Sequence, residues 1–235
     1  MSSRVDAYVL ERLRASPVLR DPFAHCIVDG VLPADFFEDV IDHWPQDSNF
    51  ISLSQTGRTG SAYRERKVIL MQPEVLSRLD EPRRGFWSTV ATWLMSEEFA
   101  RAIAERFAHE LEAAGSLWRK RGVRGDALIV SDRTDYAIGP HTDSPRRVVS
   151  LLFYLPEDGA FGRYGTSFYV PRDRQFRCPG GPHHDPRHFE LVKTVEFVPN
   201  RLVAFPKNDH CFHGVERVDL PGIERRLLIY DVQLN

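Results

Sequence analysis

The spacing of hydrophobic residues changes near residue 125 and divides the chain into two parts. Before this point, apolar residues recur every three or four positions, which is the spacing of amphipathic helices. The spacing predicts helices over 4–15, from Pro33 to Ile41, and over 83–114 with a break near Met95-Ser96. We interpret the aromatic residues of the longest stretch as core, because they repeat at helical spacing.

The second part of the chain carries strand signals. Short runs rich in Val, Ile, Leu, Phe and Tyr are separated by Gly, Pro, Asn and Asp. The predicted strands cover 127–130, 148–155, 166–170, 191–198, 202–205 and 227–232. Several short strands without helices between them favour a sandwich or barrel. We therefore expect an α+β, mainly β protein, in which a helical region, 1–125, supports a β core, 126–235, as one compact unit.

Composition and charge narrow the classes of function. The 235 residues carry a net charge of −2, so no overall basic surface favours a nucleic-acid partner. Cys26, Cys178 and Cys211 form no CxxC pair, and their odd number argues against a disulfide framework. No apolar run has the length of a membrane span, and the N-terminus lacks the pattern of a signal peptide. These features predict a cytoplasmic protein without a membrane partner.

Two polar segments lie between the predicted elements. Residues 55–67 combine two glycines with basic side chains, and residues 172–189 combine arginines with His183, His184 and His188. Segment 55–67 is either a solvated surface loop or a lid that meets an anionic substrate. The three histidines lie among Pro and Gly, which favours a place in a rim or lid over a second metal site.

A histidine and an aspartate two residues apart provide the first candidate chemistry. Side chains two apart on an extended chain point to the same side, so His141 and Asp143 can reach one metal ion. About 70 residues later, a strand ends near two more histidines, His210 and His213, either of which could be a third ligand. Two imidazoles and one carboxylate on one face of a metal are typical of non-haem iron(II) oxygenases.

Two arginines at the start of the last predicted strand offer a partner for a carboxylate. The fork of a guanidinium pairs with a carboxylate bidentately, as the distal end of a dicarboxylate co-substrate would require. Neighbouring strand residues face opposite ways, so only one of Arg225 and Arg226 points inward. The spacing to the following aromatic residue favours Arg226. Arg133 and Tyr136, which lead into the His141 motif, either face the cavity and contact the co-substrate or substrate, or are a surface arginine and a core tyrosine.

From about Leu128 to Val232, the order and spacing of the motifs resemble the 2-oxoglutarate/iron(II) dioxygenase superfamily, and specifically its prolyl-4-hydroxylase-like branch. The matching segments are HTDSP with SLLFYLP, GTSFYVP, RLVAFP, HGV and RRLLIYDV. The resemblance implies a double-stranded β-helix, which is a jelly-roll or cupin-like core, with N-terminal helices packed on it. It also implies iron(II) at His141, Asp143 and His213, because the family has a Gly-Val or similar pair directly after the last ligand.

The resemblance further implies 2-oxoglutarate as co-substrate and dioxygen as oxidant. The distal carboxylate would bind an arginine of the last strand and a tyrosine that Tyr154 matches. The family often has a serine or threonine near this arginine, where the present chain has Leu227 and Leu228. The implied reaction releases succinate and CO2 and hydroxylates an unactivated C–H bond of a small-molecule, carbohydrate or peptidyl substrate. The two basic segments favour a polar or anionic small molecule, or a carrier-bound or glycosylated one.

Two other functions are compatible with a metal site on this kind of barrel. A cupin-like isomerase or hydrolase would use the same fold and a divalent metal, but it has no need of the arginine strand. A non-catalytic metal-binding barrel is the other alternative, although all three ligands are present. Halogenation is disfavoured because Asp143 keeps the carboxylate at the position where a halogenase needs space for halide.

Overall fold

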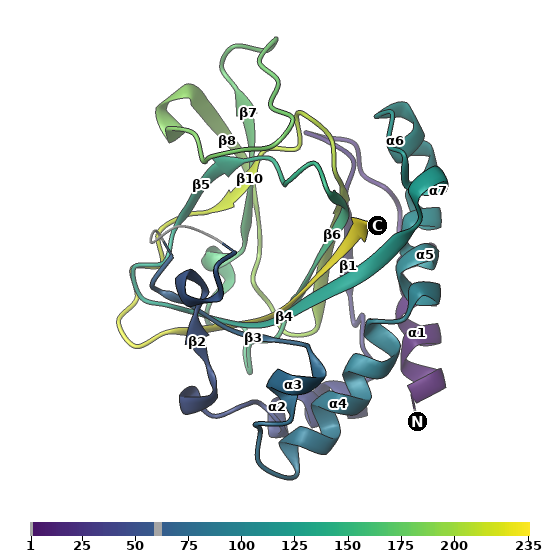
Figure 1. Cartoon of the computed structure of the whole chain (residues 1–235). Coiled ribbons are helices and arrows are strands. Elements are labelled where there is room, and N and C mark those ends of the chain that lie inside the picture. The colour runs from purple at the N-terminus through teal and green to yellow at the C-terminus, as the bar shows by residue number, and fades with distance from the viewer. Residues whose placement is uncertain (1, 59–62) are drawn as a thin grey trace.

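Two antiparallel sheets face each other in the computed structural model, which describes residues 2–58 and 63–235, and helices cover the larger sheet (Figure 1). In spatial order, the larger sheet contains β1 (Cys26–Asp29), β9 (Arg201–Pro206), β6 (Arg147–Tyr154), β11 (Glu224–Leu234), β4 (Val123–Arg133), β3 (Arg66–Leu70) and β2 (Ile51–Ser52). The smaller sheet contains β5 (Ile138–His141), β10 (His213–Val215), β7 (Thr166–Pro171) and β8 (Phe189–Val195). This arrangement is a double-stranded β-helix, so the predicted fold class is confirmed.

The helices come from the N-terminal part of the chain, as the hydrophobic spacing predicted. They are α1 (Ser2–Ala15), α2 (Ala34–Asp42), α3 (Pro73–Leu76), α4 (Arg83–Leu94), α5 (Glu97–Arg106), α6 (Ala108–Ala113) and α7 (Trp118–Arg121). The break near Met95-Ser96 is confirmed: the Ser96 hydroxyl accepts a hydrogen bond from Phe99 N and caps α5. A second break at the fully buried Phe107, which the spacing did not predict, separates α5 from α6.

The alternation of side chains along the central strands divides the core into two layers. On β6, the side chains of Val149, Leu151 and Phe153 pack with the helices, whereas Leu152 and Tyr154 pack between the sheets. The same period operates on β11, where Leu228, Tyr230 and Val232 pack with the helices and Leu227 and Ile229 lie between the sheets. Both faces of these strands are buried, so the inner face can hold a closed site.

The N-terminal part of the chain also contributes strands to the larger sheet. β1 pairs with β9, and β3 pairs with β4, so residues from both ends of the sequence share one sheet. Segment 55–67 therefore ends inside β3, and its residues 59–62 lie outside the described part of the chain. Among the described residues, no helix combines the length and the apolar composition that crossing a bilayer requires.

Candidate active site

A cavity of about 460 Å³ lies between the two sheets. Its walls include His141, Asp143 and His213 at one end, and Arg225 with Tyr136 farther along. The apolar walls are formed by Leu53, Leu128, Ile138, Leu152, Phe205, Val215, Leu227 and Ile229. A larger cleft of about 800 Å³ lies beside α6 and α7, but none of the three predicted metal ligands lines it.

The strand pairing of the smaller sheet brings the predicted metal ligands together. β10 and β5 are antiparallel, and His213 lies directly opposite His141, with ring centroids 4.4 Å apart. Asp143 follows β5 by two residues, and its Oδ2 lies 3.7 Å from His213 Nε2. One potential ligand atom from each residue lies within 4.8 Å of the other two, close enough for one ion to bind all three.

The hydrogen bonds of the two histidines leave the correct nitrogen atoms free for a metal. His141 Nδ1 contacts Gly139 O at 3.0 Å, and His213 Nδ1 contacts Cys211 O at 2.9 Å. Each Nδ1 therefore carries the proton, and each Nε2 keeps its lone pair. Burial lowers the pKa of His141 to about 3 and also lowers the pKa of His213, so both rings are neutral at physiological pH. Two neutral imidazoles and a carboxylate fit iron(II).

A second set of contacts holds the carboxylate of Asp143 in place. Arg147 Nη1 donates to Asp143 Oδ1 at 2.5 Å, and the Ser150 hydroxyl donates to Oδ2 at 2.7 Å. Burial by itself would raise the pKa of Asp143, but the charge of Arg147 and the hydrogen bond from Ser150 hold that pKa below its usual value. Arg147 also pairs with Asp231 at 3.0 Å, and burial raises the pKa of Asp231 to about 6.

The remaining histidines occupy different places. His210 is exposed and contacts Asp209, so the structure brings His213 rather than His210 to the other two ligands. His183 lines the cavity, with its ring centroid 4.6 Å from that of His141, and the Tyr63 hydroxyl lies 2.6 Å from its Nδ1. His184 and His188 lie outside this cavity, beside a small pocket of about 300 Å³.

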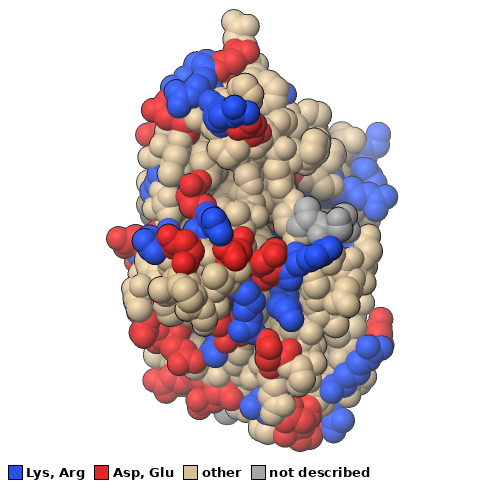
Figure 2. Space-filling view, turned by 90° about the vertical axis from the view of Figure 1, so that its left-hand side faces the viewer, with Lys and Arg blue, Asp and Glu red and all other residues tan. Residues whose placement is uncertain are grey.

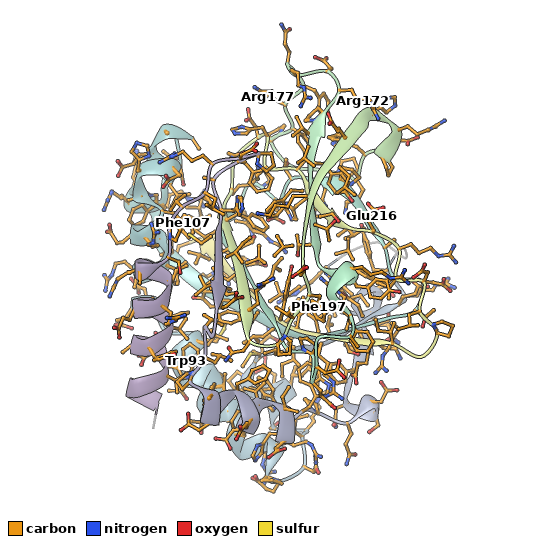
Figure 3. All side chains as sticks on the ribbon, turned by 180° about the vertical axis from the view of Figure 1, so that it is seen from behind. Trp93, Phe107, Arg172, Arg177, Phe197 and Glu216 are labelled. Carbon is orange, nitrogen blue, oxygen red and sulfur yellow. The ribbon has the colours of Figure 1, made fainter. Side chains whose placement is uncertain are left out.

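Only the first of the two adjacent arginines faces the cavity. The side chain of Arg225 is 1% exposed and donates hydrogen bonds to Asp132 and to Tyr164 O. Its Cζ lies 4.7 Å from the ring centroid of Phe197, which Figure 3 labels. Arg226 lies on the outer face, where it contacts Glu224 and Glu157. The prediction that Arg226 points inward is therefore wrong.

Arg225 faces the cavity and Arg226 does not because side chains alternate between the two faces of β11. Leu227 and Ile229 face the space between the sheets, and the same period places Arg225 on that side.

The other predicted co-substrate residues divide between the cavity and its surroundings. Tyr136 lines the cavity, and its buried hydroxyl has no hydrogen-bond partner among the described residues. The Tyr154 hydroxyl contacts Thr166 through both its Oγ1 and its backbone N, at 2.7 and 2.8 Å, so Thr166 rather than Tyr154 lines the wall. Arg133 lies outside the cavity and pairs with Asp47 and Glu224.

Arg66 also lines the cavity, although it was not among the predicted site residues. Its guanidinium binds both oxygens of Asp132, at 2.6 and 2.9 Å, and its Cζ lies 4.4 Å from the centroid of the Tyr136 ring. The alternation on β3 could have indicated it. Val68 faces the space between the sheets and Ile69 faces the helices, so Arg66 shares the inner side with Val68.

Neighbouring carboxylates neutralise much of the positive charge in the two basic segments. Arg58 pairs with Asp126, and Arg187 pairs with Asp185. Figure 2 shows the same mixing on one face of the molecule, where Lys and Arg lie next to Asp and Glu. The cationic composition of these segments is therefore a weak argument for an anionic substrate.

Comparison with known proteins identifies the fold. No protein-family model matches the sequence, and no curated protein matches it. A prolyl hydroxylase from Trichoplax adhaerens, in complex with a hypoxia inducible factor oxygen degradation domain peptide fragment, superposes with a TM-score of 0.56. It is 13% identical over 99% of this chain and 90% of its own. A Pseudomonas putida prolyl-4-hydroxylase has a TM-score of 0.52 and 16% identity, covering 98% of this chain and 99% of its own.

A third similar structure has ligands bound. HygX from Streptomyces hygroscopicus, with nickel, 2-oxoglutarate and hygromycin B bound, has a TM-score of 0.50 and 11% identity over 90% of this chain and 83% of its own. The present chain therefore has the fold of prolyl hydroxylases and of a 2-oxoglutarate-binding protein, and the predicted resemblance in fold is confirmed.

Proposed function

We propose that this protein is an iron(II)- and 2-oxoglutarate-dependent oxygenase. One observation carries the proposal: one cavity contains His141, Asp143 and His213 at one end and the buried Arg225 farther along, with a Tyr136 hydroxyl that has no partner among the described residues. A metal ion and a dicarboxylate can therefore occupy the same cavity. A cupin-like isomerase or hydrolase would need the metal ligands but not a buried guanidinium.

Each group has a defined role in this proposal. The free Nε2 atoms of His141 and His213, together with Asp143, hold the metal, and Arg147 and Ser150 orient the carboxylate. Arg225 binds the distal carboxylate of 2-oxoglutarate, to which the Tyr136 hydroxyl donates. Bound iron(II) would supply the oxidation of 2-oxoglutarate and of a substrate C–H bond by dioxygen.

The apolar residues of both sheets exclude water from the cavity, which protects the reactive centre. We infer that the substrate is a small molecule, a carbohydrate or a peptidyl group that is hydroxylated. Two observations support a polar substrate. Structures of this fold have a peptide fragment and hygromycin B bound. In addition, Tyr63 and His183 present hydrogen-bonding groups beside the proposed metal ligands.

Succinate formation tests the proposed function. Purified protein supplied with iron(II), ascorbate, dioxygen and 2-oxoglutarate should release succinate slowly even without the true substrate. His213→Ala should abolish this release, because one of three ligands is lost. His210→Ala is the matched control, since His210 is exposed and lies outside the cavity. Absence of succinate with the wild-type protein, or equal rates for the two variants, would overturn the proposal.

A further inference from the structure

Three charged side chains form a row across neighbouring strands of the larger sheet. Arg66 on β3 lies opposite Asp132 on β4, and Asp132 lies opposite Arg225 on β11. All three side chains are directed to the inner side of the sheet, where Asp132 accepts hydrogen bonds from both guanidinium groups. The role that we infer for this row rests on the proposed function.

The row carries one more positive charge than negative charge. Asp132 is the acidic partner of both Arg66 and Arg225, and neither arginine has a second acidic partner in the described part of the chain. The side chains of Arg66, Asp132 and Arg225 are 12%, 0% and 1% exposed, so water screens this excess charge poorly. A buried positive charge without a counterion is costly, and an anionic group of the ligand would remove that cost.

Each arginine of the row lines the cavity and keeps one terminal nitrogen without a hydrogen-bond partner among the described residues. Arg66 donates to Asp132 through Nε and Nη2. Arg225 donates to Asp132 through Nη1 and to Tyr164 O through Nε. The Nη1 of Arg66 and the Nη2 of Arg225 donate to no described residue. The Tyr136 hydroxyl, also without a partner, belongs to the ring that stacks on Arg66.

We propose that Arg66 is a second guanidinium of the site that binds the distal carboxylate of 2-oxoglutarate. Asp132 holds Arg66 and Arg225 close to each other despite their like charge and orients one free edge of each toward the cavity. The carboxylate neutralises the excess charge and accepts from both arginines and from Tyr136. The site therefore selects dicarboxylic 2-oxo acids over monocarboxylic ones.

Two ligands that differ only at the distal end test this role. 2-Oxovalerate has the chain length of 2-oxoglutarate but a methyl group in place of the distal carboxylate. Titration calorimetry on nickel-loaded protein measures the binding of each ligand without turnover. Arg66→Met should lower the affinity for 2-oxoglutarate by about 10- to 100-fold, which is the typical loss for a charged hydrogen bond in a buried site. The affinity for 2-oxovalerate should be almost unchanged. Arg66→Lys, which keeps the charge but loses the fork, should give an intermediate loss for 2-oxoglutarate.

Lys67→Met is the matched control for the loss of a positive charge. Lys67 is the next residue of β3, faces the other side of the sheet and does not line the cavity. The Lys67→Met variant should bind both ligands with the affinity of the wild-type protein. If Arg66→Met binds 2-oxoglutarate with wild-type affinity, the inference is wrong while the proposed function stands. If Arg66→Met loses affinity equally for both ligands, or no longer binds the metal, Arg66 has a structural role and the inference is also wrong. If the wild-type protein binds neither ligand, the proposed function itself fails.

Discussion

The two ends of the cavity use opposite arrangements of charge. At the metal end, one arginine lies between two acids: Arg147 pairs with both Asp143 and Asp231. At the other end, one acid lies between two arginines: Asp132 pairs with both Arg66 and Arg225. With all of these groups ionised, the first end carries an excess negative charge and the second an excess positive charge. The cavity is therefore complementary to a cation at one end and to an anion at the other.

The two ends also differ in how the fold builds them. The proposed metal ligands come from β5 and β10 of the smaller sheet and from the residues just after β5. The charged row comes from the middle of the larger sheet, which is buried on both sides. Because the charged row lies in a sheet that is covered on both sides, we expect it to contribute to folding as well as to binding.

The largest expected effect on stability is at the centre of the row. Asp132→Asn removes the one acidic partner that two buried arginines have in the described part of the chain, so we expect the free energy of unfolding to fall by about 3–5 kcal/mol. Urea denaturation followed by circular dichroism measures this change. Asp135→Asn is the control, because Asp135 is exposed and pairs with the exposed Arg217. That surface pair should contribute less than about 1 kcal/mol. Equal losses in the two variants would contradict the stabilising role of Asp132 in the charged row.

The next effect concerns the arginine at the metal end. Arg147→Met removes the donor that fixes Asp143 and leaves the ligand itself in place, so metal affinity should fall by about 10- to 100-fold. Competition with a chelator, monitored with cobalt(II) or nickel(II), measures the affinity. Arg146→Met is a matched control, because Arg146 is the exposed neighbour outside the cavity. Unchanged affinity in Arg147→Met would show that Asp143 is held in place by other contacts.

A smaller effect is expected from pH in the metal-free protein. The pKa of His141 is about 3 in the folded chain, against about 6.5 in an unfolded one. Below pH 6.5 the unfolded chain therefore binds a proton that the folded chain does not, and acidification favours unfolding. The free energy of unfolding should fall by about 1 kcal/mol per pH unit from this histidine alone.

Asp231, with a pKa raised to about 6, binds its proton more readily when folded and offsets part of that loss. The melting temperature of His141→Gln, which has no imidazole at this position, should decline less between pH 7 and pH 5. Parallel curves for wild type and variant would show that His141 is protonated in the folded protein.

The metal end could be predicted from the sequence because its residues are close in sequence or follow a recognisable strand. His141 and Asp143 are two residues apart, and His213 comes just before Gly214-Val215. Whether His210 or His213 reaches the metal depended on the strand pairing that places His213 opposite His141.

The charged row could not be predicted in the same way. β11 is buried on both faces, so Leu227, Leu228 and Ile229 form an apolar run without the alternation that would show which arginine faces inward. Arg66 lies far in sequence from Asp132 and Arg225, and only the pairing of β3, β4 and β11 brings the three together.

The binding of 2-oxoglutarate to variants of the two adjacent arginines decides whether this cavity is a 2-oxoglutarate site. In a calorimetric titration of the nickel-loaded protein, Arg225→Met should lose about 100-fold or more in affinity, since the main partner of the distal carboxylate is removed. Arg226→Met should bind like the wild type, because Arg226 lies on the outer face with Glu224 and Glu157. Wild-type affinity in Arg225→Met, or a comparable loss in Arg226→Met, would contradict the assignment of this cavity as a 2-oxoglutarate site.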